Sequence, residues 1–157
     1  MKKIILLFLV ISTVWACGTT KTVRTSKKVI KGDWTLNRIT FSTYGTFKVT
    51  FFNDVSKSCI EGSQWKFIPN NNSGTYTIGN DNCEQGERNI IFTIQEVDPE
   101  TGLYDFLLKP TDAKHKSDTN QGFRLKLTML NEASMQWQQK ASIDGKTIAI
   151  DMNFSKN

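Results

Sequence analysis

Hydrophobic and polar positions alternate along the last third of the chain, in three segments that cover 122–130, 134–143 and 146–154. Strict alternation is typical of a β-strand with one buried face. The apolar faces consist of Phe123, Leu125, Leu127 and Met129; of Met135, Trp137, Ala141 and Ile143, with Gln139 among them; and of Ile148, Ile150, Met152 and Phe154. The dipeptide Asp144-Gly145 favours a tight hairpin between the last two segments. The pattern predicts an antiparallel meander with one wet face and one buried face.

Shorter runs of β-branched and aromatic residues precede these segments, separated by Gly, Asn, Asp and Pro. They cover 32–41, 46–52, 64–68, 74–78, 89–97 and 103–109, where 46–52 is either a strand or an irregular lead-in. No periodicity suits a long helix, so the sequence predicts a single all-β domain over 32–157. A barrel of about eight strands would leave no exposed edge. The residues alone leave a barrel and an open sandwich as alternatives.

The start of the chain has the build of a secretory signal. Lys2 and Lys3 precede a nearly aliphatic run over 4–14, which is too short to cross a membrane. The run ends in Val14-Trp15-Ala16-Cys17, which resembles the bacterial lipoprotein box. That resemblance implies cleavage before Cys17 and acylation of its sulfur and amine. An ordinary signal peptide with an incidental cysteine is the alternative.

The sequence therefore divides into three parts. We expect 1–16 to be a lipoprotein signal peptide, 17–31 to be a lipidated cysteine with a flexible basic tether, and 32–157 to be the β-domain. The tether is rich in Thr and Lys and poor in apolar residues. The predicted location is the cell envelope, with the lipid anchor in the outer membrane.

Cys59 and Cys83 remain once Cys17 is assigned to lipid. An even pair in an exported chain favours a disulfide. Closing a loop of about 25 residues stabilises a fold by about 3–4 kcal/mol in the chain-entropy model. A metal site is not expected, because the chain has one histidine and no CxxC spacing.

The excess of basic residues lies in the N-terminal segment before residue 32 and not in the domain. Of the 20 Lys and Arg residues, two lie in the signal and five in 18–31, which contains no acidic residue. The domain from 32 onward keeps 13 basic residues against 15 acidic ones. Nucleic-acid binding is therefore not expected, whereas basic residues next to an anionic membrane surface are attracted to it.

The opening of the domain, KGDWTLNRI, resembles the Gly-x-Trp motif of the lipocalin superfamily, here carried by Gly32 and Trp34. Further stretches, including GERNIIFTIQE, MQWQQ and DGKTIAIDMNF, look like the lipocalin-like lipoproteins of Gram-negative bacteria. The resemblance covers nearly all of 32–157 and implies an up-and-down barrel with Trp34 plugging a closed end. Two features depart from the family: LNEAS replaces the usual Thr-Asp-Tyr, and Lys156 is the nearest cation where an arginine usually covers the tryptophan.

The resemblance favours a binding protein that holds a small hydrophobic molecule in the barrel. If the apolar faces point inward, the lumen contains one polar group and six apolar side chains: Gln139 with Phe92, Leu125, Leu127, Trp137, Ile148 and Ile150. The same residues would also suit a filled core, so the sequence leaves two alternatives, a barrel with an empty lumen and a filled barrel. The alternative function is an accessory or inhibitory envelope lipoprotein that acts through its loops, with 110–121 as a candidate patch.

An enzyme is not expected. His115 lies in a polar, lysine-flanked loop, and the carboxylates have no partner in a recognisable constellation. Nucleophile-elbow and phosphate-binding motifs are missing, and no cofactor is predicted.

Overall fold

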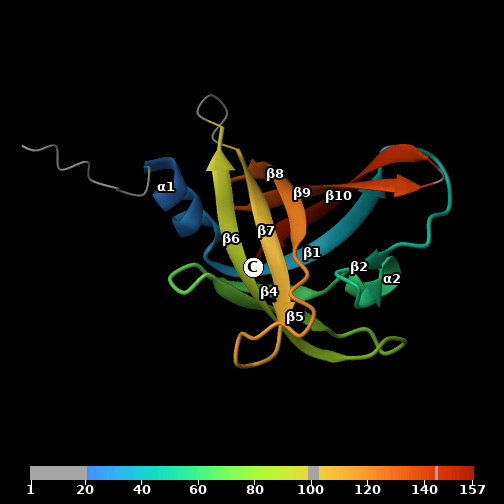
Figure 1. Ribbon diagram of the computed structural model, residues 1–157, viewed down its shortest axis with the longest axis horizontal. Helices are drawn as coiled ribbons and strands as arrows, with labels where there is room; N and C mark the ends of the chain where they lie inside the picture. The colour runs from blue at the N-terminus through green and yellow to red at the C-terminus, as the bar shows by residue number, and fades with distance from the viewer. Residues whose placement is uncertain (1–20, 99–102, 144) are drawn as a thin grey trace, which may run out of the picture.

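The chain folds into a closed antiparallel barrel of eight strands (Figure 1). The computed structural model describes residues 21–98, 103–143 and 145–157. The barrel strands are β1 (Gly32–Phe41), β4 (Gln64–Ile68), β5 (Ser73–Ile78), β6 (Gly86–Val97), β7 (Tyr104–Thr111), β8 (Phe123–Leu130), β9 (Ser134–Ile143) and β10 (Lys146–Lys156). The other elements are α1 (Lys21–Ile30), β2 (Thr50–Phe51), β3 (Val55–Ser56) and α2 (Lys57–Ile60).

Each barrel strand pairs with its neighbours in sequence, and β1 closes the ring by pairing with both β4 and β10. This order is that of an up-and-down barrel. The closed up-and-down barrel of eight strands predicted from the sequence is therefore confirmed, and the open sandwich is wrong. Closure removes the unpaired edges that an open sheet of this length would expose.

Aromatic side chains fill the inside of the barrel. The Trp137 ring packs against four other rings, those of Trp65, Phe67, Phe106 and Phe154, with centroid separations between 4.7 and 5.7 Å. All five of these side chains are at most 3% exposed. Offset-stacked and edge-to-face contacts of this kind stabilise a core beyond the burial of their area. The interior is thus a packed core.

One end of the barrel, where β1 begins and β10 ends, is closed by Trp34; we call it the closed end. The Trp34 side chain is fully buried, and its Nε1 donates a hydrogen bond to the Ile30 carbonyl at 2.9 Å. Lys156 places Nζ 5.2 Å from the centre of the Trp34 ring and donates to the Val29 carbonyl at 2.7 Å. Lys156 therefore supplies the cation that covers the tryptophan, within the range of a cation–π contact.

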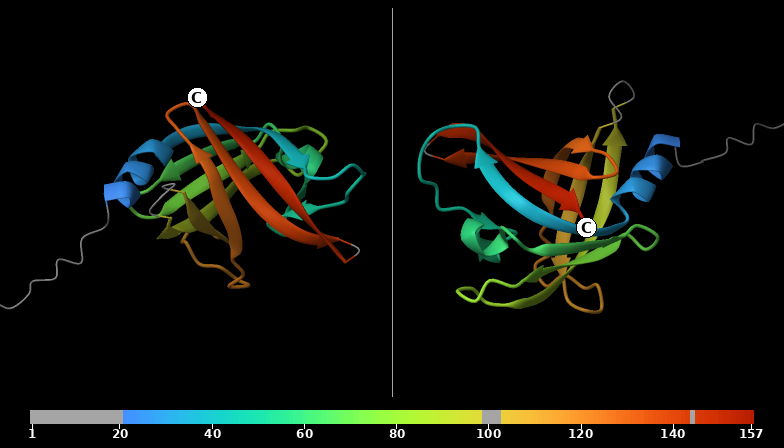
Figure 2. Two further views of the ribbon diagram at one scale, coloured as in Figure 1. Left: turned by 90° about the horizontal axis from the view of Figure 1, so that it is seen from above. Right: turned by 180° about the vertical axis from the view of Figure 1, so that it is seen from behind.

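Helix α1 lies against this closed end (Figure 2), where the sequence predicted a flexible tether through residue 31. That prediction is wrong for Lys21–Ile30. The helix is held because Ile30 and Ser26 are buried against the barrel and Lys27 Nζ donates to Asn72 Oδ1 at 3.1 Å. The sequence did not predict these contacts, because the segment contains few apolar residues. Cys17 and the signal sequence lie outside the described residues.

A bulge in β8 corrects one predicted face. The register between β8 and β9 shifts between Leu127 and Met129, so Leu130 pairs with Met135. Met129 consequently turns outward and is 40% exposed, whereas strict alternation placed it with Leu127. An extra residue in one strand reverses the alternation beyond it.

The packed interior makes Trp137 a sensitive position. Trp137→Ala should lower the free energy of unfolding by about 3–5 kcal/mol, because the surrounding rings leave a cavity. Met129→Ala, at an exposed site on the neighbouring strand, should change it by less than about 0.5 kcal/mol. Urea unfolding of both variants measures the difference. A loss near 1 kcal/mol for Trp137→Ala would instead mean an interior that is already partly empty.

Candidate functional site

The structure brings most of the predicted lumen residues together. Phe92, Leu125, Leu127, Trp137 and Ile150 are all buried in one interior cluster. Ile148 is buried too, opposite Ala141 of β9, and Gln139 is half-buried opposite Ile150. The five clustered side chains pack with further aromatic residues of the core. Ligand binding by this set stays a prediction.

The opposite end of the barrel, where β1 ends, is the mouth, and residues 42–63 cross it; we call them the mouth segment (Figure 2). The segment contains β2, β3 and α2. Its side chains Phe51, Phe52, Val55 and Ile60 are buried to 6% exposure or less. The sequence suggested only a strand or a lead-in at 46–52 and gave no sign that this loop covers the barrel.

The side chain of Phe52 fills the mouth of the barrel. Its ring lies 5.4 Å from that of Phe123 and 5.9 Å from that of Trp65, in edge-to-face contacts. Its backbone has φ 55°, and the next residue, Asn53, has φ 58°. A left-handed conformation is rare for a bulky residue and costs roughly 1–2 kcal/mol. Burial of the ring in the mouth offsets this strain.

A partly exposed polar cluster fixes the turn that carries Phe52. Asp54 Oδ2 accepts a hydrogen bond from the Tyr76 hydroxyl at 2.7 Å and from Arg88 Nε at 3.1 Å. Burial, and then the hydrogen bond to Asp54, raise the pKa of the Tyr76 phenol. The phenol therefore stays protonated and donates. The cluster joins the mouth segment to β5 and β6.

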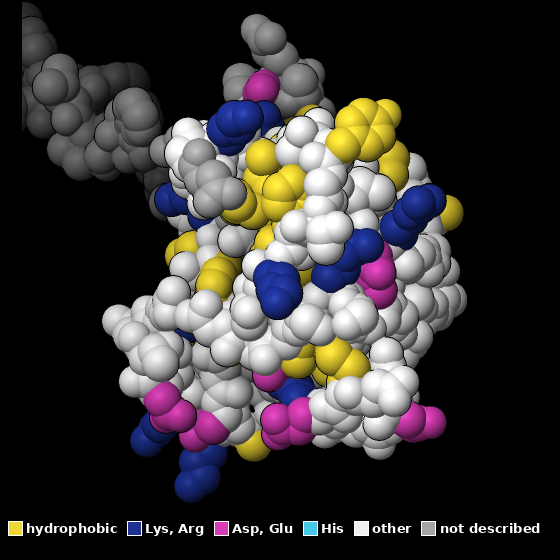
Figure 3. Space-filling model, turned by 90° about the vertical axis from the view of Figure 1, so that its right-hand side faces the viewer, with side chains coloured by type: hydrophobic (Ala, Val, Ile, Leu, Met, Phe, Trp, Pro, Cys, Tyr) yellow, Lys and Arg dark blue, Asp and Glu magenta, His cyan; other side chains and the backbone are white. Residues whose placement is uncertain are grey.

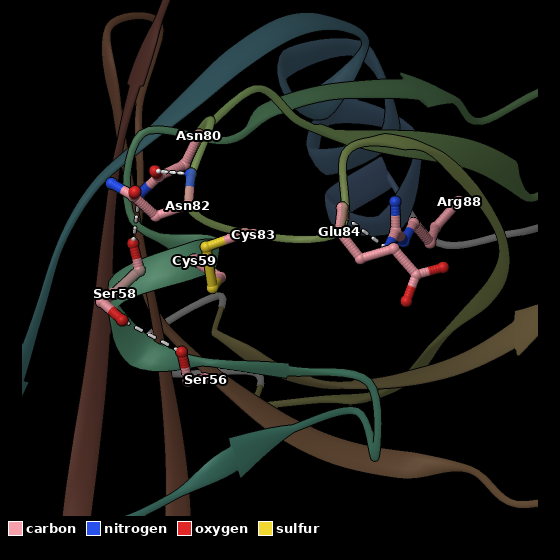
Figure 4. The surroundings of a disulfide bond; sticks show 8 residues. All are labelled: Ser56, Ser58, Cys59, Asn80, Asn82, Cys83, Glu84 and Arg88. Carbon is pink, nitrogen blue, oxygen red and sulfur yellow. Dashed lines mark hydrogen bonds between the residues drawn. A yellow bond between two sulfur atoms is a disulfide. The ribbon is translucent and has the colours of Figure 1, made fainter.

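A disulfide fastens the mouth segment at a second point. Cys59 on α2 is bonded to Cys83 in the β5–β6 loop, with a Cα–Cα distance of 5.7 Å, which confirms the predicted pairing (Figure 4). Beside it, Asn80 Nδ2 donates to the Ser58 carbonyl at 3.0 Å. The two contacts hold α2 against the β5–β6 loop.

A pocket of about 330 Å³ lies at the mouth, between the mouth segment and the β7–β8 loop. Its volume is in the range of small-molecule sites. The lining residues are Phe52, Asn53, Asp54, Pro110, Thr111, Asp112, Ser117, Asp118, Thr119, Gln121 and Phe123. Figure 3 shows the side of the molecule where the mouth segment lies, with acidic side chains gathered in its lower part and hydrophobic ones between them.

The pocket combines an aromatic wall with hydrogen-bond acceptors. Phe52 and Phe123 form the wall, and Asn53 Nδ2 donates to Gln121 Oε1 at 2.7 Å across the rim. The Thr111 hydroxyl is buried and has no hydrogen-bond partner among the described residues. A buried hydroxyl without a partner costs free energy, but the Thr111 oxygen is covered by its neighbours and is not exposed in the pocket.

The charges at the pocket are negative. Asp54 is paired with Arg88, whereas within the described chain Asp112 and Asp118 form no salt bridge. Asp112 Oδ1 accepts backbone N–H groups of Lys114 and Lys116, both at 2.8 Å, which shapes the β7–β8 loop. No Lys, Arg or His lines the pocket. The site therefore suits a neutral or cationic molecule with an apolar face better than an anion.

Two other depressions are less suited to a small molecule. One, of about 380 Å³, lies on the outer wall and is lined by Asp105, Arg124, Lys126, Gln138 and Lys140. The other, of about 410 Å³, lies beside α2 and is the more open of the two. Its lining residues all belong to the mouth segment, within the range 47–61. Neither has a wall of two aromatic rings.

The candidate histidine and metal ligands were also placed in the structure. His115 is exposed in the β7–β8 loop and does not line the pocket. Among the described residues no three His, Cys, Asp or Glu side chains group as metal ligands. Within the same residues, neither helix has the length and apolar character to cross a membrane.

The sequence suggested the loop 110–121 only as a patch for contacts with a protein partner, and in the structure this loop forms one side of the pocket. The other side, Phe52 to Asp54, was missed, because its contacts join residues far apart in sequence. The one local signal was a pair of phenylalanines followed by Asn-Asp, a turn-forming dipeptide.

Comparison with known proteins adds little. No protein-family model matches the chain, and no curated protein does. Among solved structures, a crystal structure of a lipocalin-like protein from Bacteroides uniformis ATCC 8492 is similar, with 11% sequence identity and a TM-score of 0.46. The similarity covers 82% of this chain and 98% of that one.

The disulfide should control the mouth segment. Replacing Cys59 and Cys83 together by Ser should lower the free energy of unfolding by about 3–4 kcal/mol. It should also speed hydrogen exchange of the amides in 50–60, while exchange in β9 and β10 changes only with global stability. Thermal unfolding and exchange mass spectrometry measure both effects. Two free thiols in the native protein, or an unchanged melting temperature, would contradict the structural role.

Proposed function

We propose that this protein is a binding protein that holds a small molecule in the mouth pocket, with the packed barrel as its rigid scaffold. The observation that carries the proposal is the position of the pocket. It lies on the ring of Phe52, directly above the aromatic core, and is walled by residues of two separate loops. Concave sites with an apolar wall and a few convergent polar groups are the common form of ligand pockets.

The chemistry of the pocket narrows the ligand. The wall of Phe52 and Phe123 favours an aromatic or aliphatic ring, and the carboxylates of Asp112 and Asp118 favour N–H or O–H donors. A carboxylate or sulfonate would lie near unpaired aspartates and would lose its hydration without gaining a cation. The proposed ligand class is a neutral or cationic ring compound of modest size.

The protein is also proposed to be a lipoprotein of the cell envelope, anchored through Cys17 to the outer membrane. Supporting this are the basic start, the apolar run and the cysteine at its end. The disulfide between Cys59 and Cys83 also fits an oxidising compartment outside the cytoplasm.

One observation favours a second candidate, a carrier that takes its ligand inside the barrel. The indole Nε1 of Trp137 is buried and has no hydrogen-bond partner among the described residues. A ligand oxygen could accept from it only after Phe52 leaves the mouth, because the aromatic rings fill the space below. The alternative predicted from the sequence is an accessory protein that acts through its loops. It also has a filled barrel, but unlike the proposed binding protein it would bind no small molecule.

A matched pair of fluorescent probes tests the pocket. N-phenyl-1-naphthylamine and 8-anilinonaphthalene-1-sulfonate share a ring system and differ in the anionic sulfonate. The neutral probe should bind the protein more tightly than the anionic one. Phe123→Ala should weaken its binding about tenfold, the loss of about 1.4 kcal/mol of ring contact. Asp118→Asn should reduce the difference in affinity between the two probes, because it removes a negative charge from the pocket. Asp33→Asn removes the same charge at the closed end, serves as the matched control, and should leave that difference unchanged.

The outcomes separate the candidates. Binding that survives Phe123→Ala but is lost in Trp137→Phe would place the ligand inside the barrel. If neither probe binds and native mass spectrometry of the purified protein shows no small molecule, the proposed binding function is wrong. That result would support the accessory function instead.

A further inference from the structure

Helix α1 is fixed to the closed end of the barrel by several independent contacts. The carbonyls of Ile30 and Val29 accept from Trp34 Nε1 and Lys156 Nζ, at 2.9 and 2.7 Å. Near the middle of the helix, Ser26 is buried at 8% exposure, and Lys27 Nζ donates to Asn72 Oδ1 at 3.1 Å. The helix and the barrel therefore share one orientation.

The outer face of α1 is basic. Lys21, Arg24 and Lys28 are exposed and follow the spacing i, i+3, i+7, which places them on one side of a helix. The buried residues Ser26 and Ile30 lie on the opposite side. The helix contains no acidic residue, and Lys31 just after it is exposed as well.

The chain before α1 sets how far this face can be from a membrane. Cys17 lies four residues before Lys21. Four residues span at most roughly 14 Å even when fully extended. An acyl chain on Cys17 would therefore hold the start of α1 close to the bilayer, within about two Debye lengths at physiological ionic strength.

We infer that the Lys21–Arg24–Lys28 face of α1 lies on an anionic membrane surface and orients the barrel, with its closed end toward the bilayer and its mouth pocket toward the aqueous phase. This inference rests on the lipid anchor of the proposed function and not on the ligand. Acidic residues Asp33 and Glu132 are at the same end, but they lie on β1 and on the β8–β9 turn and not on the helix.

The helix would lie on the surface and not insert. An inserting amphipathic helix needs an apolar face turned to the lipid, whereas the buried face of α1 is turned to the barrel. The interaction is therefore electrostatic and weakens with salt. Each basic residue near an anionic surface should change the population at the surface about fivefold.

Lysine labelling of the lipidated protein in vesicles tests the orientation. The protein is reconstituted in phosphatidylcholine vesicles with and without phosphatidylglycerol, treated briefly with an amine-reactive ester, and digested for mass spectrometry. Lys21 and Lys28 should react about fivefold more slowly when phosphatidylglycerol is present, and high salt should abolish the difference. Lys114 and Lys116, in the β7–β8 loop at the mouth, should react equally in both.

Paired variants supply the control for charge. The double variant Arg24→Gln, Lys28→Gln should lose the protection of Lys21, whereas Lys114→Gln, Lys116→Gln removes the same charge and should keep it. Equal reactivity of Lys21 in both vesicles, or protection at the mouth instead, overturns the orientation alone. A protein recovered without lipid on Cys17 overturns the anchor and the orientation together, and leaves the ligand proposal standing.

Discussion

The contacts of Trp137 with the rings around it decide what this barrel can do. An eight-stranded barrel is wide enough for its own side chains or for one small ligand, but not for both. Here Trp137 stacks on Phe106 with an interplanar angle of 28° and meets Trp65 edge-on at 88°. The strands are therefore held by a continuous aromatic core, and functional groups are displaced to the ends of the barrel.

The two ends are closed in different ways, and the difference suits different roles. At the closed end, Trp34 is covered by Lys156 and by α1, which follows directly from the N-terminal segment. At the mouth, Phe52 is held in a strained backbone by Asp54 and by the disulfide of α2. Strained, over-determined residues are frequent at ligand sites. The pocket beside Phe52 fits that pattern, and the basic helix at the other end fits attachment to a surface.

Much of the fold follows from the sequence because alternation in a strand reports directly which face is buried. The last three strands were predictable in this way. The role of the Gly32-x-Trp34 opening followed from the resemblance to lipocalins, and the cysteine pair followed from the even number left once Cys17 is assigned to lipid. Alternation failed at Met129, where a bulge reversed it. It also said nothing of α1 or of Phe52, because their positions depend on contacts with distant strands.

The candidate site was less predictable than the fold for the same reason. The predicted interior residues such as Leu125 and Leu127 are together and buried, yet sequence cannot tell a filled core from a cup. That distinction depends on the volumes of Trp65, Phe67 and Phe106, whose rings meet Trp137 or each other only in the closed barrel. The pocket depends on two loops meeting across the mouth, as Asn53 and Gln121 do.

The packed interior can be tested directly by a crystal structure of the protein under xenon pressure. Xenon enters apolar cavities in proteins when they are empty. Close packing around Trp137 predicts no xenon between Trp34 and Phe52 inside the barrel. A well-occupied xenon atom beside Trp137 would contradict a filled barrel and would return the ligand to the lumen.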